Sequence, residues 1–292
     1  MLLPLGRGWL NLLLAAAIVA GSAEWTGPAF GQDEPPAADS GGAQADLAAA
    51  AQNPIAAMVS LPFQNNTFFR TGPDNDTANV LNIQPVIPFN LGNWNVITRT
   101  IIPVIYLPSV TDSLPEVPSA DRSGDDFGLG DINVSAYFSP VSTGIFTWGI
   151  GPSLTMRTAT SDRLGSQKWS AGPAAVALVM APPWVAGTLV RQLWSFSGKD
   201  DRDDVSQMLI QPFVNYNMAK GWYLVTSPII TINWQAESDN AAVVPIGGGV
   251  GRVFSVGGQA LNAQMQGFYN AVRPDFAPQA SLRLQLTFLF PK

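Results

Sequence analysis

Apolar segments and polar connections alternate along the chain from Ala57 to Phe290. About a dozen apolar stretches of roughly 10 residues follow one another, and this is the length that a tilted membrane-spanning strand needs. Tight turns on one side and long loops on the other are typical of outer-membrane barrels with an even strand number. The short connections (90–92, 140–143, 181–183, 218–221 and 255–258) alternate with the long ones (69–76, 107–127, 158–166, 197–206, 235–240 and 271–279). The pattern predicts an all-β fold, a transmembrane antiparallel up-and-down β-barrel of about 12 strands.

Three segments, 131–138, 146–156 and 261–266, show the two faces of such strands clearly. In each of them apolar residues alternate with small or polar ones, so that every strand has one apolar face. This alternation predicts that the apolar face contacts lipid and the polar face lines the lumen. A soluble antiparallel sheet with its core on the apolar side would show the same alternation, and no single segment separates the two.

The tryptophans beyond the N-terminal region favour the membrane interpretation, because all of them fall near predicted strand ends. Trp94, Trp148, Trp184 and Trp222 lie at the starts of alternate strands, whereas Trp169, Trp194 and Trp234 lie at the opposite ends. Amphipathic indole rings are favoured at both membrane–water interfaces. The spacing therefore predicts two aromatic girdles.

Polar residues on the other face are predicted to point into the lumen. Arg99 lies in the middle of a strand, where a lipid-facing arginine would cost roughly 2–4 kcal/mol. Its side chain is therefore expected inside the barrel. The same orientation is predicted for Asn133, Arg157, Gln211, Asn215, Gln264, Gln266, Arg283 and Gln285. These residues could form either a hydrogen-bonded plug or a surface that solutes contact.

If the lumen conducts, its arginines should favour anionic solutes such as aromatic carboxylates over cations. Arg191 also lies near a predicted extracellular strand end, but Leu189 and Leu193 share its face, so its orientation stays open.

The N-terminal region has a different composition from the barrel. Residues 1–31 resemble a secretory signal peptide, with Arg7 before an apolar run and small-residue cleavage sites after residue 23 or 31. Residues 32–53 are rich in Ala, Pro, Gly and acidic or amide groups, which predicts a disordered periplasmic tail. The barrel is then expected over residues 54–292, a usual length for one β domain.

Composition excludes several classes of function. The chain has no histidine and no cysteine, which rules out Ser-His triads, histidine-ligated zinc and thiol catalysis. The charged fraction is 12%, about half the roughly 25% of soluble domains, and the net charge of -6 gives no basis for nucleic-acid binding. The acidic run 200–204 is interpreted as a solvated loop and Gly247–Gly251 as close packing in a strand, because no helix follows it. No enzyme activity, catalytic residue, metal or cofactor is therefore predicted.

Prolines within the predicted strands each remove a ladder donor, and bulges or strand ends would have to absorb them. They are Pro85, Pro103, Pro152, Pro173, Pro212, Pro228 and Pro245. The last strand alternates up to Phe290 like the closing strand of an outer-membrane barrel, and its aromatic end resembles the signal read by the barrel-assembly machinery. Pro291 and Lys292 follow that phenylalanine, a departure from the usual terminal aromatic.

Five segments carry a resemblance to a family of bacterial outer-membrane proteins. They are residues 79–88, 94–103, 128–131, 211–217 and 244–251. The chain resembles the putative meta-pathway of phenol degradation family, whose members are often described as transporters. The resemblance implies an outer-membrane barrel with a role in the uptake of small organic compounds, aromatic ones among them.

Two functions are therefore considered. The first is an outer-membrane channel or transporter for passive uptake of small organic solutes, aromatic or anionic ones included. The alternative is a closed structural or interaction barrel whose extracellular loops, especially 107–127, bind a partner. In both cases the expected partners are outer-membrane lipids and, during insertion, the barrel-assembly machinery, and the channel would also contact its small-molecule solute.

Overall fold

The computed structural model describes residues 47–72, 74–108, 125–141 and 144–291. All of them belong to one compact unit that spans residues 41–292. The predicted signal peptide and the predicted tail up to residue 46 lie outside the described residues, as does most of the loop 107–127. Among the described residues, no helix has the length and apolar character that crossing a membrane would require.

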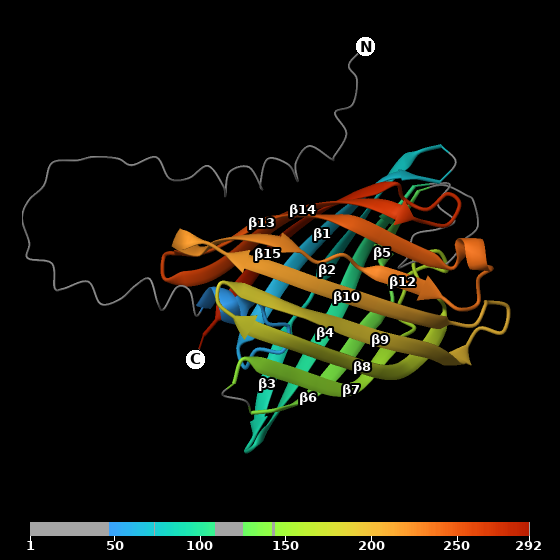
Figure 1. The fold of residues 1–292 in the computed structure, drawn as a ribbon. Coiled ribbons are helices and arrows are strands. Elements are labelled where there is room, and N and C mark those ends of the chain that lie inside the picture. The colour runs from blue at the N-terminus through green and yellow to red at the C-terminus, as the bar shows by residue number, and fades with distance from the viewer. Residues whose placement is uncertain (1–46, 73, 109–124, 142–143, 292) are drawn as a thin grey trace, which may run out of the picture. The chain divides into compact units, whose positions relative to one another are not determined.

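In the described part of the chain, fifteen β-segments form a single sheet that closes on itself (Figure 1). The first eight are β1 (Val59–Thr71), β2 (Asp76–Ile83), β3 (Val86–Leu91), β4 (Trp94–Leu107), β5 (Asp126–Leu129), β6 (Ile132–Pro140), β7 (Phe146–Met156) and β8 (Lys168–Ala181). The others are β9 (Trp184–Gly198), β10 (Ser206–Asn217), β11 (Trp222–Thr226), β12 (Ile230–Asn233), β13 (Ala242–Val256), β14 (Gln259–Val272) and β15 (Ala280–Phe290).

Three pairs of segments, β2/β3, β5/β6 and β11/β12, each make one interrupted strand. β2 and β3 both pair with β1 and β4, β11 and β12 both pair with β10 and β13, and β5 and β6 both pair with β4. The barrel therefore has 12 antiparallel strands, as the sequence predicts. It closes where β1 pairs with β15, in a register that places Val59 opposite Phe290. An antiparallel closure of this kind leaves no exposed sheet edge.

Several prolines lie where the ladder is irregular. Pro85 lies in the break between β2 and β3, and Pro228 lies in the break between β11 and β12. Pro245 lies at a register shift in the pairing of β13 with β14. Pro152 and Pro173 are directly opposite each other on β7 and β8, so two missing donors coincide in one pair. The interruptions therefore accommodate these residues, which cannot donate to a neighbouring strand.

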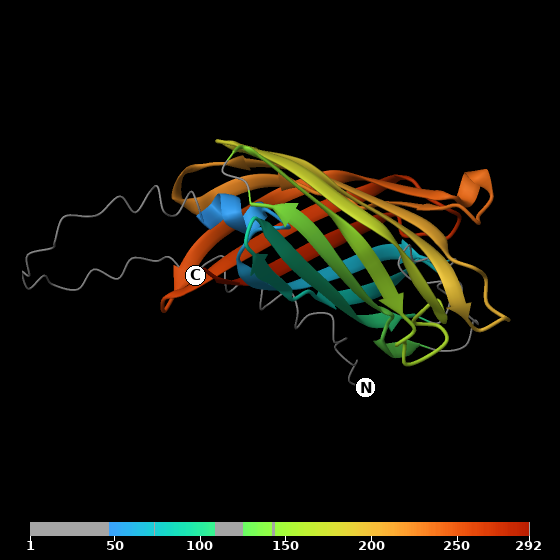
Figure 2. The same cartoon turned by 90° about the horizontal axis from the view of Figure 1, so that it is seen from below.

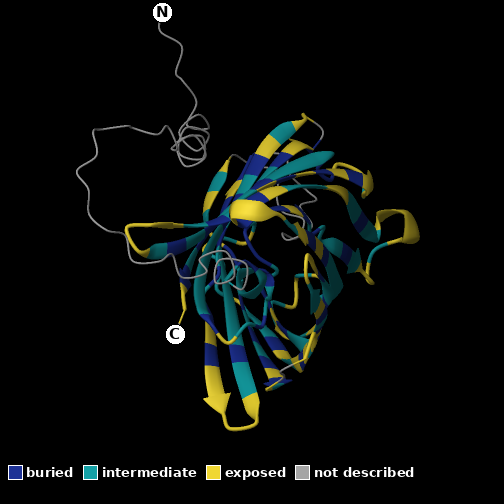
Figure 3. Cartoon of the chain, turned by 60° about the vertical axis from the view of Figure 1, so that its left-hand side comes forward, coloured by how far each residue is buried: buried dark blue, intermediate teal, exposed yellow. Residues whose placement is uncertain are grey.

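The faces of the strands follow the predicted alternation. On β6, Asn133, Ser135 and Tyr137 are buried, while Phe138 on the other face is exposed. Figure 3 shows the same succession of buried and exposed residues along the other strands. Large apolar side chains cover the outside, which is the arrangement that a lipid environment requires.

Residues 47–53 differ from the flexible tail that the sequence predicts over residues 32–53. Residues 47–52 form a short helix, which lies at the end of the barrel where β15 finishes (Figures 1 and 2). Ala48 and Ile55 are 3% and 4% exposed, and each belongs to a cluster of side chains from the barrel wall. Alanine has the highest helix propensity, so an alanine-rich segment forms a helix once its apolar side can be buried.

Candidate functional site

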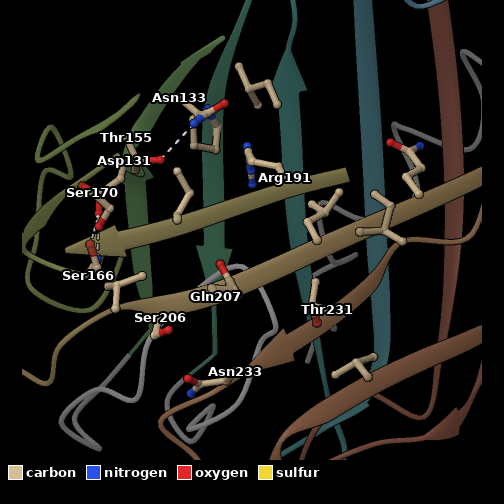
Figure 4. A pocket seen from close by; sticks show the side chains of 18 of the residues that line it. Asp131, Asn133, Thr155, Ser166, Ser170, Arg191, Ser206, Gln207, Thr231 and Asn233 are labelled. Atoms are coloured by element: carbon tan, nitrogen blue, oxygen red, sulfur yellow. Dashed lines mark hydrogen bonds between the residues drawn. The ribbon is translucent and has the colours of Figure 1, made fainter. Parts of the chain in front are cut away.

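The lumen contains a cavity of about 720 Å³. Its wall is built from inward-facing residues of ten segments, β1, β2, β4, β6, β7, β8, β9, β10, β12 and β13, and its mouth from the loop residues 201–205, 240–241 and 274–275. The cavity therefore opens at the end with the long loops. Figure 4 shows polar side chains from several strands converging on it, together with unlabelled apolar ones.

Arg99 and Gln84 form the polar centre of the wall on β4 and the β2/β3 break. The Nη2 of Arg99 donates a hydrogen bond of 2.5 Å to the Oε1 of Gln84. Gln84 is 4% exposed, and its backbone N donates to the carbonyl of Pro62 on β1. Gln84 keeps the inward phase of Val80, Asn82 and Val86 across the break at Pro85, so its buried amide oxygen faces the guanidinium.

Asn133 lies in a second polar cluster, on β6 and β7. Its Nδ2 donates to the Oγ of Ser153 at 3.0 Å and to the Oγ1 of Thr155 at 2.9 Å. The hydroxyl of Ser135 donates to the Oγ of Ser153 at 2.9 Å. These bonds satisfy buried polar groups and hold this part of the wall in one arrangement.

Asp131 anchors the loop 158–166 over the cavity. Its carboxylate accepts hydrogen bonds from the backbone N of Thr158 and of Ala159, each 3.1 Å long. It also accepts from the backbone N of Ser166 at 2.7 Å and from the hydroxyl of Ser166 at 2.9 Å. Hydrogen bonds to an ionised acceptor are stronger than neutral ones. The interruption between β5 and β6 therefore places a residue that fixes an outer loop.

Ion pairs join the outer loops to one another. Lys168 contacts Asp204 at 3.2 Å, and Lys199 contacts Asp162 at 2.5 Å. The hydrogen bond from Lys168, and a second one from Ser195, keep the pKa of Asp204 below its ordinary value. The pKa of Asp162 is lowered chiefly by its hydrogen bond from Lys199. One carboxylate of the acidic run at residues 200–204, that of Asp204, is thus paired with a basic side chain.

The other predicted lumen residues are distributed over three places. Gln211, like Arg99 and Asn133, lines the cavity. Asn215, Gln264, Gln266, Arg283 and Gln285 face inward by register but lie outside the cavity lining. Arg157 is exposed just beyond β7, and its Nε donates to the Oε1 of Gln167 at 2.8 Å.

Arg283 is held in a buried network beside the β11/β12 break. Its Nε donates to the Oδ1 of Asn66 at 3.1 Å, and its Nη1 donates to the carbonyl of Ser227 at 2.8 Å. The backbone N and the hydroxyl of Ser227 donate to the Oε1 of Gln266. The guanidinium also lies 5.0 Å from the centroid of the Phe268 ring. Arg283 thereby stabilises the wall where the strand is interrupted.

The periplasmic half of the lumen is filled by apolar side chains. Ile55 belongs to one buried cluster with residues of the barrel wall, namely Val86, Ile97, Tyr137, Ala174, Val176, Leu178, Val185, Leu189 and Phe213. Ala48 and Met58 pack with residues of β11, β13, β14 and β15. The side chains of Gln52 and Asn217 exchange hydrogen bonds of 2.7 and 3.3 Å. The cavity therefore has a closed floor on the side of the short turns.

The tryptophans lie on the outside near the strand ends. Trp94 and Trp148 meet edge to face at 6.2 Å between centroids, and Trp184 meets Tyr216 at 4.8 Å. Trp222 lies 5.2 Å below the guanidinium of Arg252. Trp169, Trp194 and Trp234 are exposed near the opposite ends of their strands.

Sequence reasoning missed Gln84 and left Arg191 open. Arg191 lines the cavity together with Leu189 and Leu193, so all three side chains share the inward face of β9. The available signal for Gln84 was its strand phase, which it shares with the buried Val80 and Asn82. Within the described ranges, no cluster of three or more acidic residues is arranged to hold a metal ion. The site can bind and orient a solute through hydrogen bonds, positive charge and apolar contact.

Comparisons with known proteins agree with this fold. The sequence profile of the family described as "Putative MetA-pathway of phenol degradation" matches residues 75–286. No curated protein matches the chain significantly. The COG4313 outer membrane channel from Pseudomonas putida F1 is similar in structure, with a TM-score of 0.62 and 16% identity over 82% of this chain and 97% of that chain. The CymD monoaromatic hydrocarbon channel has a TM-score of 0.42 and 10% identity, covering 80% and 88% of the two chains.

Proposed function

We propose that this chain, which belongs to the family described as "Putative MetA-pathway of phenol degradation", is an outer-membrane channel for passive uptake of small organic solutes. The observation that carries this proposal is the cavity of about 720 Å³, which opens among the outer loops. Such a volume lies within the roughly 300–1,000 Å³ of small-molecule sites. Outer-membrane lipids would surround the barrel, and the barrel-assembly machinery would insert it.

The mixed chemistry of the cavity supports this class of solute. Aliphatic side chains such as Ile101, Leu193 and Leu209 lie beside Gln207 and Gln211. An apolar wall with a few polar groups suits a small molecule that is mainly apolar and carries one polar group. The COG4313 outer membrane channel, which the chain resembles in structure, is itself described as a channel.

The closed floor favours the second candidate, a barrel that does not conduct. Residues 47–58 and the surrounding wall fill the periplasmic half in the structure. A channel would need this segment to move or to leave a narrow path beside it. A structural barrel would need neither.

Purified protein in planar bilayers separates the two candidates. Reproducible single-channel steps, together with uptake of small aromatic solutes into liposomes, are expected for the channel. A barrel that migrates differently before and after boiling, and is therefore folded, but stays electrically silent and impermeable would exclude the channel and favour the structural role.

A further inference from the structure

The guanidinium of Arg99 lies in the lumen with a neutral partner. Its hydrogen-bond partner among the described residues is the amide oxygen of Gln84. The ion pairs described above, Lys168–Asp204 and Lys199–Asp162, lie at the outer loops and do not involve Arg99. A cation removed from bulk water is costly unless a negative charge compensates it. An amide oxygen orients the guanidinium but does not neutralise it.

Arg99 is also held in position by its surroundings. Gln84 is tied to β1 through its backbone N, and the backbone N of Thr100 donates to the carbonyl of Pro85 at 3.1 Å. The guanidinium has five N–H donors, and the hydrogen bond to Gln84 uses one on Nη2. A planar fork with free donors and a fixed orientation is the arrangement that binds a carboxylate through two parallel hydrogen bonds.

A second arginine lines the same cavity from another part of the wall. Arg191 lies on β9, four strands along the sheet from β4, and Figure 4 shows it among the lining side chains. Positive charge therefore faces the cavity from two sides. Asp131, a carboxylate in the same lining, already accepts four hydrogen bonds from the loop 158–166.

Aliphatic side chains lie beside these cations. Ile101 follows two residues after Arg99 on the same face, and Leu189 and Leu193 flank Arg191. A ligand that bonds to a guanidinium here would place the rest of its body against apolar surface. The lining also includes carboxylates at the mouth, Asp201, Asp203, Asp204 and Asp275, of which Asp204 pairs with Lys168.

We propose that Arg99, oriented by Gln84 and supported by Arg191, forms a binding site for small organic monocarboxylates with an apolar body. The carboxylate bonds to the guanidinium of Arg99, and the apolar part lies against Ile101 and the leucines of β9. This site names the solute class of the proposed channel and rests on that function, since a solute must enter the lumen to reach it.

Three probes of nearly identical shape test the site: benzoate, benzamide and benzamidine carry a negative, a zero and a positive charge. Calorimetric titration of the purified full-length barrel should show benzoate binding roughly tenfold or more tightly than benzamide, and benzamidine binding weakest. Equal affinity for benzoate and benzamide in the wild-type protein would overturn the proposal, without any substitution being needed.

Substitutions then locate the site. Arg99→Gln should abolish the preference for benzoate while leaving the affinity for benzamide unchanged, whereas Arg99→Lys should keep part of the preference. Arg157→Gln is the matched control, because that arginine is exposed outside the cavity lining, and it should behave like the wild type. The site would be refuted if folded Arg99→Gln kept the full preference for benzoate. It would also be refuted if Arg99→Lys bound benzoate and benzamide with equal affinity.

The bilayer experiment keeps this inference separate from the proposed function. Conduction without a preference for benzoate would leave the channel standing and remove the carboxylate site. Arg99-dependent binding of benzoate by a silent barrel would support the site and exclude passive uptake.

Discussion

The two halves of the lumen differ in chemistry although the same strands build both. In the extracellular half the inward side chains include Asn133, Ser170 and Gln207, and they line an open cavity. In the periplasmic half of β8 the inward side chains are Val176 and Leu178, 3% and 1% exposed. The rule that inward residues of a membrane barrel are polar therefore holds along the cavity, and apolar residues replace them on β8 where another segment fills the lumen. On β10, β14 and β15 the inward residues outside the cavity lining still include Asn215, Gln264 and Gln285.

Deletion of residues 47–57 should have the largest effect on this difference. These residues supply Ala48 and Ile55 to the clusters that close the floor. Single-channel conductance in planar bilayers should rise several-fold, because removal of the segment would leave open space between the apolar side chains of the wall. A deletion of residues 32–44, which spares the helix, serves as the control. Unchanged conductance in a folded barrel would mean that the wall side chains close the lumen without the segment.

Gly251→Ala should destabilise the packed half. A Cβ at this position would lie 2.2 Å from the Cζ of Tyr223, which is fully buried and donates to the Oδ1 of Asn262 at 2.6 Å. Overpacking of this kind costs about 1–3 kcal/mol. Gly267→Ala on β14 is the matched control, since a Cβ there meets nothing within 4 Å. Urea unfolding in detergent compares the two, and equal midpoints would contradict the packing argument.

Asp131→Asn should loosen the open half without affecting the floor. The substitution keeps the shape of the side chain but removes the charge that three backbone N–H groups and one hydroxyl bond to. Hydrogen bonds to charged groups contribute about 1.5–3 kcal/mol each. Amide hydrogen exchange at residues 158, 159 and 166 should therefore accelerate roughly tenfold or more. Asp275→Asn, also at the mouth, should leave these amides unchanged.

The pH dependence of the Lys168–Asp204 contact should give the smallest effect. The pKa of Asp204 is lowered in the folded chain, so its stabilising contribution is complete above the ordinary aspartate pKa of about 3.9. That contribution is lost as the pH falls through the lowered value. Lys168→Gln should return the pKa of Asp204 toward its ordinary value, as an NMR titration of the carboxyl would measure. A pKa that stays low in the variant would point to Ser195 as the main cause.

The strand pattern could be predicted because it depends on local geometry. A period of two in hydrophobicity, the parity of the connections and the placement of Trp94 and Trp184 at strand starts are visible without any tertiary contact. These features predict a closed barrel of about 12 strands, which the structure has. The inward position of Arg99 follows from the cost of placing a cation in lipid, which does not depend on the details of packing.

The helix at residues 47–52 could not be predicted in the same way. Its composition is that of a flexible tail, and an isolated helix of this length is unstable in water. It forms because the barrel wall buries Ala48 and because Asn217 bonds to Gln52. Those partners lie far along the chain, so no local pattern indicates them.

The sequence by itself determined the class of fold, the strand number and the side of the wall on which Arg99 lies, because these follow from the period of the strands and from the energetics of lipid exposure. Only the tertiary structure decided which inward residues share a cavity. Gln84 bonds to Arg99, Arg191 lines the same cavity from β9, and Arg283 is held by Ser227 and Asn66 outside that cavity. Barrel closure brings these distant segments together, and only side-chain packing determines which of them remain accessible to a solute.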